Sequence, residues 1–367
     1  MNVLRENGAI IPPTLIEAVR WNCDIASAGQ AGHFSLCGLL LRLRQLFKWE
    51  HRLPPWREAE PEAVLEWIAR RERTWDELEE AEWRALAWGR AAIDPFAVET
   101  LNDHLLPQGL AYGAGLSRGL TPTFFLGELL EVRREGALTI LILGPELARD
   151  LDASPALCQG TLIYARRQAL AFYLWDHLSD PIQQKNAFLH VALKAYHLNL
   201  QGLLRDPEAH QERFDAFLAG ELEAAIRHEM GEALEPGLKS AFPAVLERFP
   251  QTRVELWVRA LKDGLPEVND WGRLAYLIDQ QSLPSLAVML AWRPGLYPAL
   301  LPELEPAFQA LLATGDWEAV DAARRQALAR LRQTAADLNA LLESSEAASD
   351  QWLQDEIKRR HLAPLGL

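Results

Sequence analysis

Most of the chain repeats apolar residues every three or four positions, which is the spacing of one face of an α-helix. The longest such stretch covers residues 206–235. Asp206 is a good N-cap residue and Pro207 fits the first helical position, and apolar side chains then recur at helical spacing. The pattern therefore predicts one long helix over residues 206–235.

Two earlier segments begin in the same way. Ser154-Pro155 and Asp180-Pro181 repeat the cap-plus-proline start, so that the three starts at residues 154, 180 and 206 lie 26 residues apart. Helices of similar length with short connections pack as antiparallel neighbours. We therefore expect a central antiparallel bundle over residues 153–283.

Residues 106–152 interrupt the helical pattern. Four glycines fall between residues 109 and 119, and residues 137–143 (ALTILIL) have the strongest strand pattern in the chain. We expect this strand to pair with residues 108–112. The glycine-rich segment 113–119 predicts a turn or a hairpin. A phosphate-binding loop is the alternative, although the segment has neither the GxGxxG spacing nor a Walker lysine.

Before this interruption, the pattern predicts helices near residues 14–26, 32–51 and 61–72. A further helix is expected from Thr74, where Thr74 and Glu77 have the spacing of a capping box. The sequence thus predicts a mainly α protein: a multi-helix bundle with a small α/β insertion around residues 106–152 and a C-terminal run of shorter helices. The expected regions are 1–105, 106–152, 153–283 and 284–367.

Charge and composition narrow the classes of partner. The 367 residues carry a formal net charge of −14, which argues against nucleic acid as the main partner. Short basic groups such as Arg166-Arg167 are expected on solvated helix faces. The three cysteines form no CxxC motif, which favours a reducing compartment. No apolar run approaches the roughly 18 residues of a membrane span, and the N-terminus lacks the apolar core of a signal peptide, so a cytoplasmic protein is predicted.

One cluster of side chains in the 206–235 helix is suited to binding a metal ion. His228 and Glu232 lie four residues apart on one helix face, and Glu221 lies two turns earlier on that face. Neither Glu-x-x-His nor HExxH occurs, so further ligands would have to come from elsewhere. The candidates are Glu255, Asp263, His33 and Glu50. The alternative is a His/Glu pair that only supports the helix by hydrogen bonding.

Two glycines share that helix face. Gly220 and Gly231 lie inside the predicted helix, where glycine costs about 1 kcal/mol relative to alanine. This cost is offset where a neighbouring chain needs the space that a side chain would fill. We therefore expect another backbone to approach this face closely.

The thirteen tryptophans are the most unusual feature of the composition. The spacing of Trp67, Trp75 and Trp83 places them on one broad helical face, which favours anchoring in the core; a tryptophan-rich binding surface is the alternative. Two functions remain open from these features. The first is a helical interaction or scaffold protein with a protein partner, and the second is a metal-binding protein or metal-dependent enzyme with a divalent ion held by Glu221, His228 and Glu232.

Several segments of the chain together resemble a family of bacterial proteins of unknown function. They are residues 33–50, 143–150, Trp175-Asp176, 228–232 and 255–263. The resemblance extends over much of the chain. It implies a bacterial cytoplasmic protein and brings no activity, substrate or cofactor with it.

Overall fold

The chain divides into two compact units in a computed structural model. The N-terminal unit comprises Met1–Asp180 and the C-terminal unit Pro181–Leu367. The structure describes residues 3–4, 10–78, 80–117, 121–238, 241–293, 295–344 and 349–366. The four regions expected from the sequence are not tested by this division and stay a prediction.

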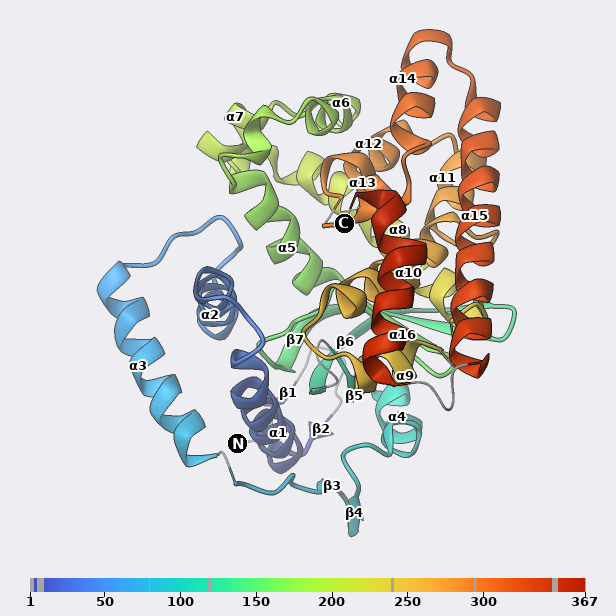
Figure 1. Cartoon of the computed structure of the whole chain (residues 1–367). Coiled ribbons are helices and arrows are strands. Elements are labelled where there is room, and N and C mark those ends of the chain that lie inside the picture. The colour runs from blue at the N-terminus through green and yellow to red at the C-terminus, as the bar shows by residue number, and fades with distance from the viewer. Residues whose placement is uncertain are drawn as a thin grey trace. The chain divides into compact units, whose positions relative to one another are not determined.

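The N-terminal unit is built on a five-stranded mixed sheet (Figure 1). Its strands are β5 (Leu110–Leu116), β6 (Pro122–Glu135), β7 (Leu138–Arg149), β8 (Ala156–Gln159) and β9 (Leu162–Arg166). The order across the sheet is β5-β6-β7-β9-β8, and all neighbours are antiparallel except β7 and β9, which are parallel. Two short hairpins accompany the sheet, β1 (Val3–Leu4) with β2 (Ile10–Ile11) and β3 (Leu86–Trp88) with β4 (Ala91–Ile93).

This sheet contradicts the prediction of a mainly α bundle with a small insertion. The chain has an α/β architecture, and the curled sheet belongs to its N-terminal unit. The strand expected at residues 137–143 is present as part of β7, but it pairs with β6 and β9 and not with residues 108–112. The hairpin predicted for residues 113–119 is confirmed, because β5 pairs antiparallel with β6 up to Leu116 and Pro122; residues 118–120 of the connection lie outside the described residues.

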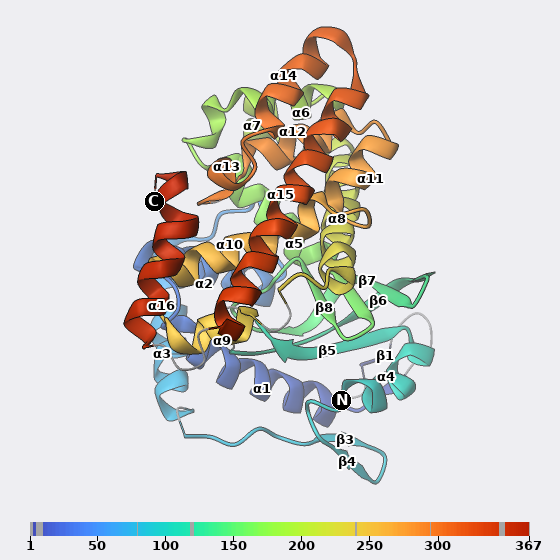
Figure 2. The same ribbon diagram turned by 45° about the vertical axis from the view of Figure 1, so that its right-hand side comes forward.

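Five helices complete the N-terminal unit. They are α1 (Pro13–Ala31), α2 (Leu36–Glu50), α3 (Pro61–Glu77), α4 (Val98–Leu105) and α5 (Arg167–Ser179). Helix α1 runs beneath the sheet in Figure 2 and packs against β6 and β7. The main core joins apolar residues of α1, such as Leu15 and Val19, to Phe124 of β6 and Leu141 of β7. A second core is formed largely by α2 and α3 and contains Trp67.

In its described residues the C-terminal unit is helical. Its helices are α6 (Ala187–Ala195), α7 (Leu200–Arg205), α8 (Gln211–Leu234), α9 (Ala241–Arg248), α10 (Arg253–Val268), α11 (Arg273–Asp279), α12 (Leu283–Ala291), α13 (Tyr297–Leu300), α14 (Leu304–Thr314), α15 (Trp317–Ser344) and α16 (Asp350–Ile357). Helix α8 packs against α10 and α11, and α15 runs beside α14 (Figure 1). Asp206 caps a short 3₁₀ turn before α8 by accepting a hydrogen bond from Ala209 N.

Three predicted helix starts are wrong. Asp180 lies at the end of α5 and does not begin a helix with Pro181, because α6 begins only at Ala187 with Asn186 as its N-cap. Residues after Ser154-Pro155 form β8 and β9, and the helix begins only at Arg167, so the expected three-helix repeat is absent. Thr74 does not cap a new helix, because α3 continues through it and its hydroxyl donates to Arg70 O. At these positions a residue that often caps a helix precedes a strand, ends a helix or lies within one.

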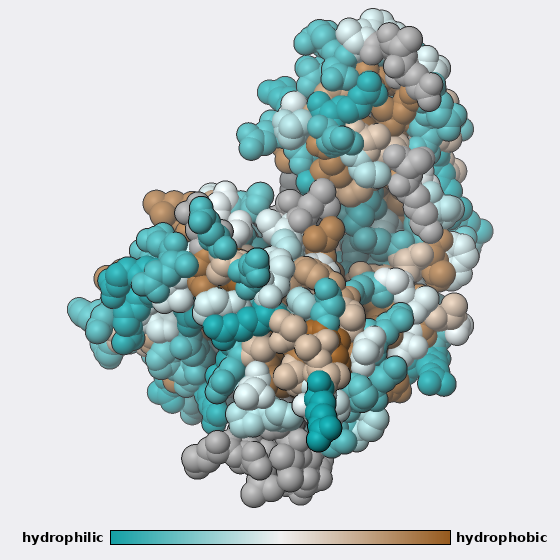
Figure 3. Space-filling model, turned by 90° about the horizontal axis from the view of Figure 1, so that it is seen from below, coloured by the Kyte–Doolittle hydropathy of each residue, from teal (hydrophilic) through white to brown (hydrophobic). Residues whose placement is uncertain are grey.

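The tryptophans of α3 lie in the core, as expected. Trp67 and Trp75 are buried, whereas Trp83 lies outside that helix. Hydrophilic residues cover most of the face shown in Figure 3, with apolar residues gathered near its middle. Within the described part of the chain, none of the helices combines the length and the apolar character required to span a membrane.

Candidate functional site

Helix α8 presents the three residues that the sequence singled out, and each has a cationic or acidic partner in the C-terminal unit. Glu221 Oε2 lies 3.4 Å from Arg273 Nη2, and Glu232 Oε2 lies 2.6 Å from Lys262 Nζ. His228 Nδ1 lies 3.1 Å from Glu267 Oε1. The three side chains are therefore held by partners from α10 and α11.

Glu267 and Arg273 join two of these contacts into one buried cluster. Arg273 Nη1 lies 3.5 Å from Glu267 Oε1, so that the ion pairs run from Glu221 through Arg273 and Glu267 to His228. Glu267 and Arg273 were not among the site residues predicted from the sequence, and they lie about 40 to 50 residues from their α8 partners. Their charges were visible in the sequence, but nothing in it indicated which helices would meet.

The cluster changes the proton affinity of its members. Burial raises the pKa of Glu221 to about 7, although the charge of Arg273 acts in the opposite direction. Burial alone would lower the pKa of His228, but the charge of Glu267 and its hydrogen bond outweigh that effect and raise it to about 9. The pKa of Glu267 is lowered against its own burial, because Arg273 and His228 stabilise the carboxylate.

Metal binding by Glu221, His228 and Glu232 stays a prediction. In the described residues, no three His, Cys, Asp or Glu side chains are grouped in a way that could hold a metal ion. Of the other candidate ligands, Glu255 pairs with Arg259 and Asp263 lies 3.6 Å from Lys262 Nζ. The remaining two, His33 and Glu50, belong to the N-terminal unit.

The N-terminal unit contains a second buried charged cluster, which the sequence did not reveal. Strand β7 ends with Glu146 and Arg149, and β9 ends with Arg166, which lies opposite Leu143 in the parallel pairing. All three side chains of the cluster are at most 1% exposed. Arg166 was expected on a solvated helix face, and that prediction is wrong because residue 166 ends a strand of the central sheet.

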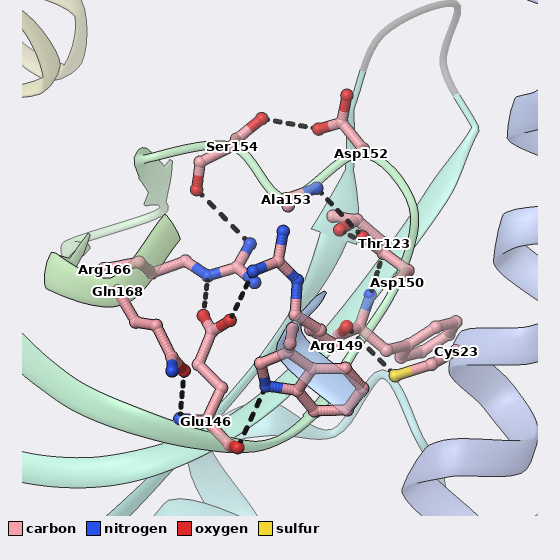
Figure 4. A network of polar contacts seen from close by, with 12 residues as sticks. Cys23, Thr123, Glu146, Arg149, Asp150, Asp152, Ala153, Ser154, Arg166 and Gln168 are labelled. Atoms are coloured by element: carbon pink, nitrogen blue, oxygen red, sulfur yellow. Dashed lines mark hydrogen bonds and ion pairs between the residues drawn. The ribbon is translucent and has the colours of Figure 1, made fainter. Parts of the chain in front are cut away.

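One carboxylate lies between the two guanidinium groups of this cluster. Glu146 Oε1 accepts a hydrogen bond of 2.5 Å from Arg166 Nε, while Glu146 Oε2 lies 3.6 Å from Arg149 Nη1 (Figure 4). The three side chains therefore carry one net positive charge. The charge of Glu146 and its hydrogen bond raise the pKa of Arg166 despite burial.

Arg149 is the less satisfied of the two arginines. It donates no hydrogen bond to any described residue, and its Nε and Nη1 atoms are sealed from solvent. Its guanidinium carbon lies 5.6 Å from the ring centre of Phe172 and 5.9 Å from that of Trp49. Burial lowers the pKa of Arg149 to about 10, and the nearby charge of Arg166 lowers it further while Glu146 raises it. Arg149 is therefore still a cation at neutral pH.

Asp150, the next residue, has a structural role. Its carboxylate accepts hydrogen bonds from Thr123 Oγ1, Phe124 N, Gln30 Nε2 and Ala153 N, and so ties β6 and α1 to the turn after β7 (Figure 4). Burial raises the pKa of Asp150. The carboxylate oxygens of Asp150 thus accept hydrogen bonds from the protein itself, whereas the guanidinium of Arg149 donates none to the described residues.

An open pocket of about 940 Å³ lies against Arg149, and all the residues that line it belong to the N-terminal unit. Apolar side chains line part of it, among them Leu46, Trp49 and Phe172. Gln168 also lines it, and its Oε1 accepts from Glu146 N, which leaves the amide nitrogen as a further donor. The residues around the pocket include four arginines and four carboxylates. The wall is thus electrically balanced, with a buried cation on one side.

Comparison with known proteins identifies the family but no activity. No curated protein and no solved structure matches the chain. The model of the N-terminal domain of a family of unknown function, DUF6866, matches residues 14–166, and the model of its C-terminal domain matches residues 171–360. This agrees with the resemblance to a family of unknown function, while the implied bacterial origin stays a prediction. Because the two models together cover most of the chain, this protein belongs to the DUF6866 family.

Proposed function

We propose that the N-terminal unit binds a small molecule that carries a carboxylate or a similar single anionic group. One observation carries this proposal: Arg149 is a buried cation on the wall of a large pocket and donates no hydrogen bond to the described residues. A buried charged group without hydrogen bonds costs several kcal/mol, and such groups are normally paired. A ligand carboxylate in the pocket would supply the missing acceptor.

The chemistry of the pocket favours this class of ligand. Because Nε and Nη1 are sealed from solvent, Nη2 is the guanidinium nitrogen left to donate a charge-assisted hydrogen bond to a ligand carboxylate. The pocket volume lies at the upper end of the range of small-molecule sites. Four acidic side chains balance the four arginines of the wall, so a polyanion such as nucleic acid would meet repulsion. The formal net charge of −14 of the whole chain also disfavours a polyanionic ligand.

The proposal is tested by replacing Arg149 with leucine. We expect Arg149→Leu to weaken the binding of a carboxylate such as phenylacetate by roughly tenfold or more, because a charge-assisted contact is lost. Calorimetric titration of phenylacetate and of its uncharged analogue phenylacetamide measures this, with Arg73→Gln, an exposed arginine of α3, as the control. Native mass spectrometry of the purified protein would also show whether an acidic small molecule is retained.

Protein stability distinguishes a ligand-binding role of Arg149 from a structural one. In Arg149→Leu, Glu146 still has its hydrogen bond from Arg166, and the net buried charge of the cluster falls to zero. We therefore expect the free energy of unfolding to stay within about 1 kcal/mol or to rise. Marked destabilisation, or equal binding of phenylacetate and phenylacetamide by the wild type, would refute the proposal.

A further inference from the structure

A second charged group borders the same pocket and has the opposite sign. It consists of Asp24 of α1, Glu50 of α2 and Arg71 of α3. Arg71 Nη1 donates to Asp24 Oδ1 at 2.6 Å, and Arg71 Nη2 donates to Glu50 Oε2. Two carboxylates thus share one guanidinium, and the group carries one net negative charge.

The position of Arg71 is fixed independently of any ligand. Its guanidinium carbon lies 4.9 Å from the ring centre of Trp67, and Trp67 Nε1 donates to the same oxygen of Glu50 at 3.2 Å. Arg71 is therefore clamped between two acids and an indole ring that is itself buried. Such an arginine orients the two carboxylates without neutralising both.

Each carboxylate keeps one oxygen without a partner. Among the described residues, no side chain or backbone group donates to Asp24 Oδ2 or to Glu50 Oε1. Burial raises the pKa of Asp24 and the charge of Glu50 raises it further, while Arg71 and Arg20 lower it. The group therefore has the acceptors and the excess negative charge that an ammonium ion requires.

The pocket is thus bordered by a negative group with free acceptors and by a buried cation, Arg149, that donates no hydrogen bond to the described residues. We propose that its ligand is a zwitterion, an amino acid or a short peptide, with its ammonium group at Asp24 and Glu50 and its carboxylate at Arg149. This inference rests on the function proposed above. Balanced wall charges agree with a ligand that has no net charge, and apolar wall residues such as Leu46 and Phe172 would contact its side chains.

Blocking one terminus of a peptide at a time tests the two ends separately. With phenylalanyl-phenylalanine as the probe, we expect N-acetylation and C-amidation each to weaken calorimetric binding to the wild type by about tenfold or more. The Glu50→Gln variant should bind the free and the N-acetylated peptide with equal affinity. The Arg149→Leu variant should bind the free and the C-amidated peptide with equal affinity. Free phenylalanine, measured in parallel, distinguishes a single amino acid from a peptide.

The controls separate the two proposals. Glu66→Gln, an exposed carboxylate of α3, should leave all affinities unchanged, and Asp24→Asn provides a second test of the negative group if Glu50→Gln fails to fold. Equal binding of the free and N-acetylated peptides to the wild type would refute the zwitterion while leaving the proposed function intact. Equal binding of the free and C-amidated peptides would refute both.

Discussion

Glu221 and His228 both hold a proton more tightly than the same residues do in water. Their pKa values of about 7 and about 9 have different causes, because burial raises the first and the neighbouring Glu267 raises the second. Both residues lie on α8 and were named from the sequence for metal binding. In the structure they belong to one cluster whose charge depends on pH near neutrality.

The first prediction concerns the pH dependence of stability. The pKa of His228 is higher in the folded state than the usual value of about 6.5. Protonated His228 therefore contributes fully to the free energy of unfolding below pH 6.5, and this stabilisation is lost as the pH rises through about 9. Glu221 ionises in the folded state only near pH 7 and in the unfolded state near pH 4.5, so the free energy of unfolding also falls as the pH rises between these values. The free energy of unfolding of the C-terminal unit should therefore fall by about 4 kcal/mol between pH 6 and 9, of which His228 contributes the larger part.

His228→Gln provides the comparison for this prediction. Chemical denaturation at pH 6, 7.5 and 9 is monitored by hydrogen exchange of peptides from α8. The free energy of unfolding should depend less steeply on pH in this variant than in the wild type. His33→Gln, which changes an exposed histidine of the N-terminal unit, should behave as the wild type does. If His228→Gln and the wild type have the same slope between pH 6.5 and 9, the pairing with Glu267 does not control the stability.

At the scale of the elements, α8 contacts the end of α10 and the turn before α11 through a glycine. A Cβ atom on Gly231 would lie 2.6 Å from Pro266 O and 2.9 Å from Gly272 Cα. Asn269 Nδ2 also donates to Gly231 O at 2.9 Å. The expected close approach of another backbone is thus confirmed at Gly231, whereas at Gly220 the nearest atom is the hydroxyl of Tyr196, a side chain.

The second prediction compares two glycines in neighbouring helices. Gly231→Ala should lower the free energy of unfolding by about 1–3 kcal/mol, because backbone atoms that cannot rotate away occupy the space of the methyl group. Gly264→Ala in α10 is the matched control. Its Cβ would meet Leu331 Cδ1 at an ordinary 3.5 Å, so alanine should be neutral or stabilise the helix by up to about 1 kcal/mol. Equal effects in urea denaturation would contradict the close contact.

Helix positions were easier to predict than strand partners. The helices predicted near residues 14–26, 32–51 and 61–72 correspond to α1, α2 and α3, which begin within four residues of the predicted starts, because periodicity and caps are local signals. Strand β7 was recognised but its partners were not: β6 precedes it directly across a tight turn, whereas the parallel partner β9 follows only after β8. The strand pattern of β7 does not by itself say which segment pairs with it. The start at Ser154-Pro155 failed because a proline after a cap residue also suits the entry to an edge strand such as β8.

For the whole molecule, the division into two units separates the two charged clusters. The pocket and its arginines belong to the N-terminal unit, while Glu221 and His228 belong to the C-terminal unit. A ligand stabilises only the region whose folded state binds it, by about 2.7 kcal/mol at a hundredfold excess over its dissociation constant. Ligand and pH should therefore act on different parts of the chain.

The third prediction follows from this separation and uses hydrogen exchange of the full chain. A saturating carboxylate or peptide should slow exchange in α1, α2 and β7, and leave α8, α10 and α11 unchanged. Raising the pH from 6 to 9, after correction for intrinsic exchange, should accelerate exchange in α8, α10 and α11. Arg149→Leu should abolish the first effect and keep the second. Protection spread evenly over both units would show that they act as one body.

The sequence by itself determined many of the helical segments and that Glu221, His228 and Glu232 share one face of α8, because periods, caps and helix faces depend on residues a few positions apart. It also indicated the close approach at Gly231. The tertiary structure decided the five-stranded sheet, the pairing of Glu267 with His228, and the burial of Arg149 beside a pocket. The parallel pairing of β7 with β9 and the meeting of α8 with α10 join segments that are not consecutive in the chain. The energy of a charge is set by the neighbours and solvent that only the folded chain provides.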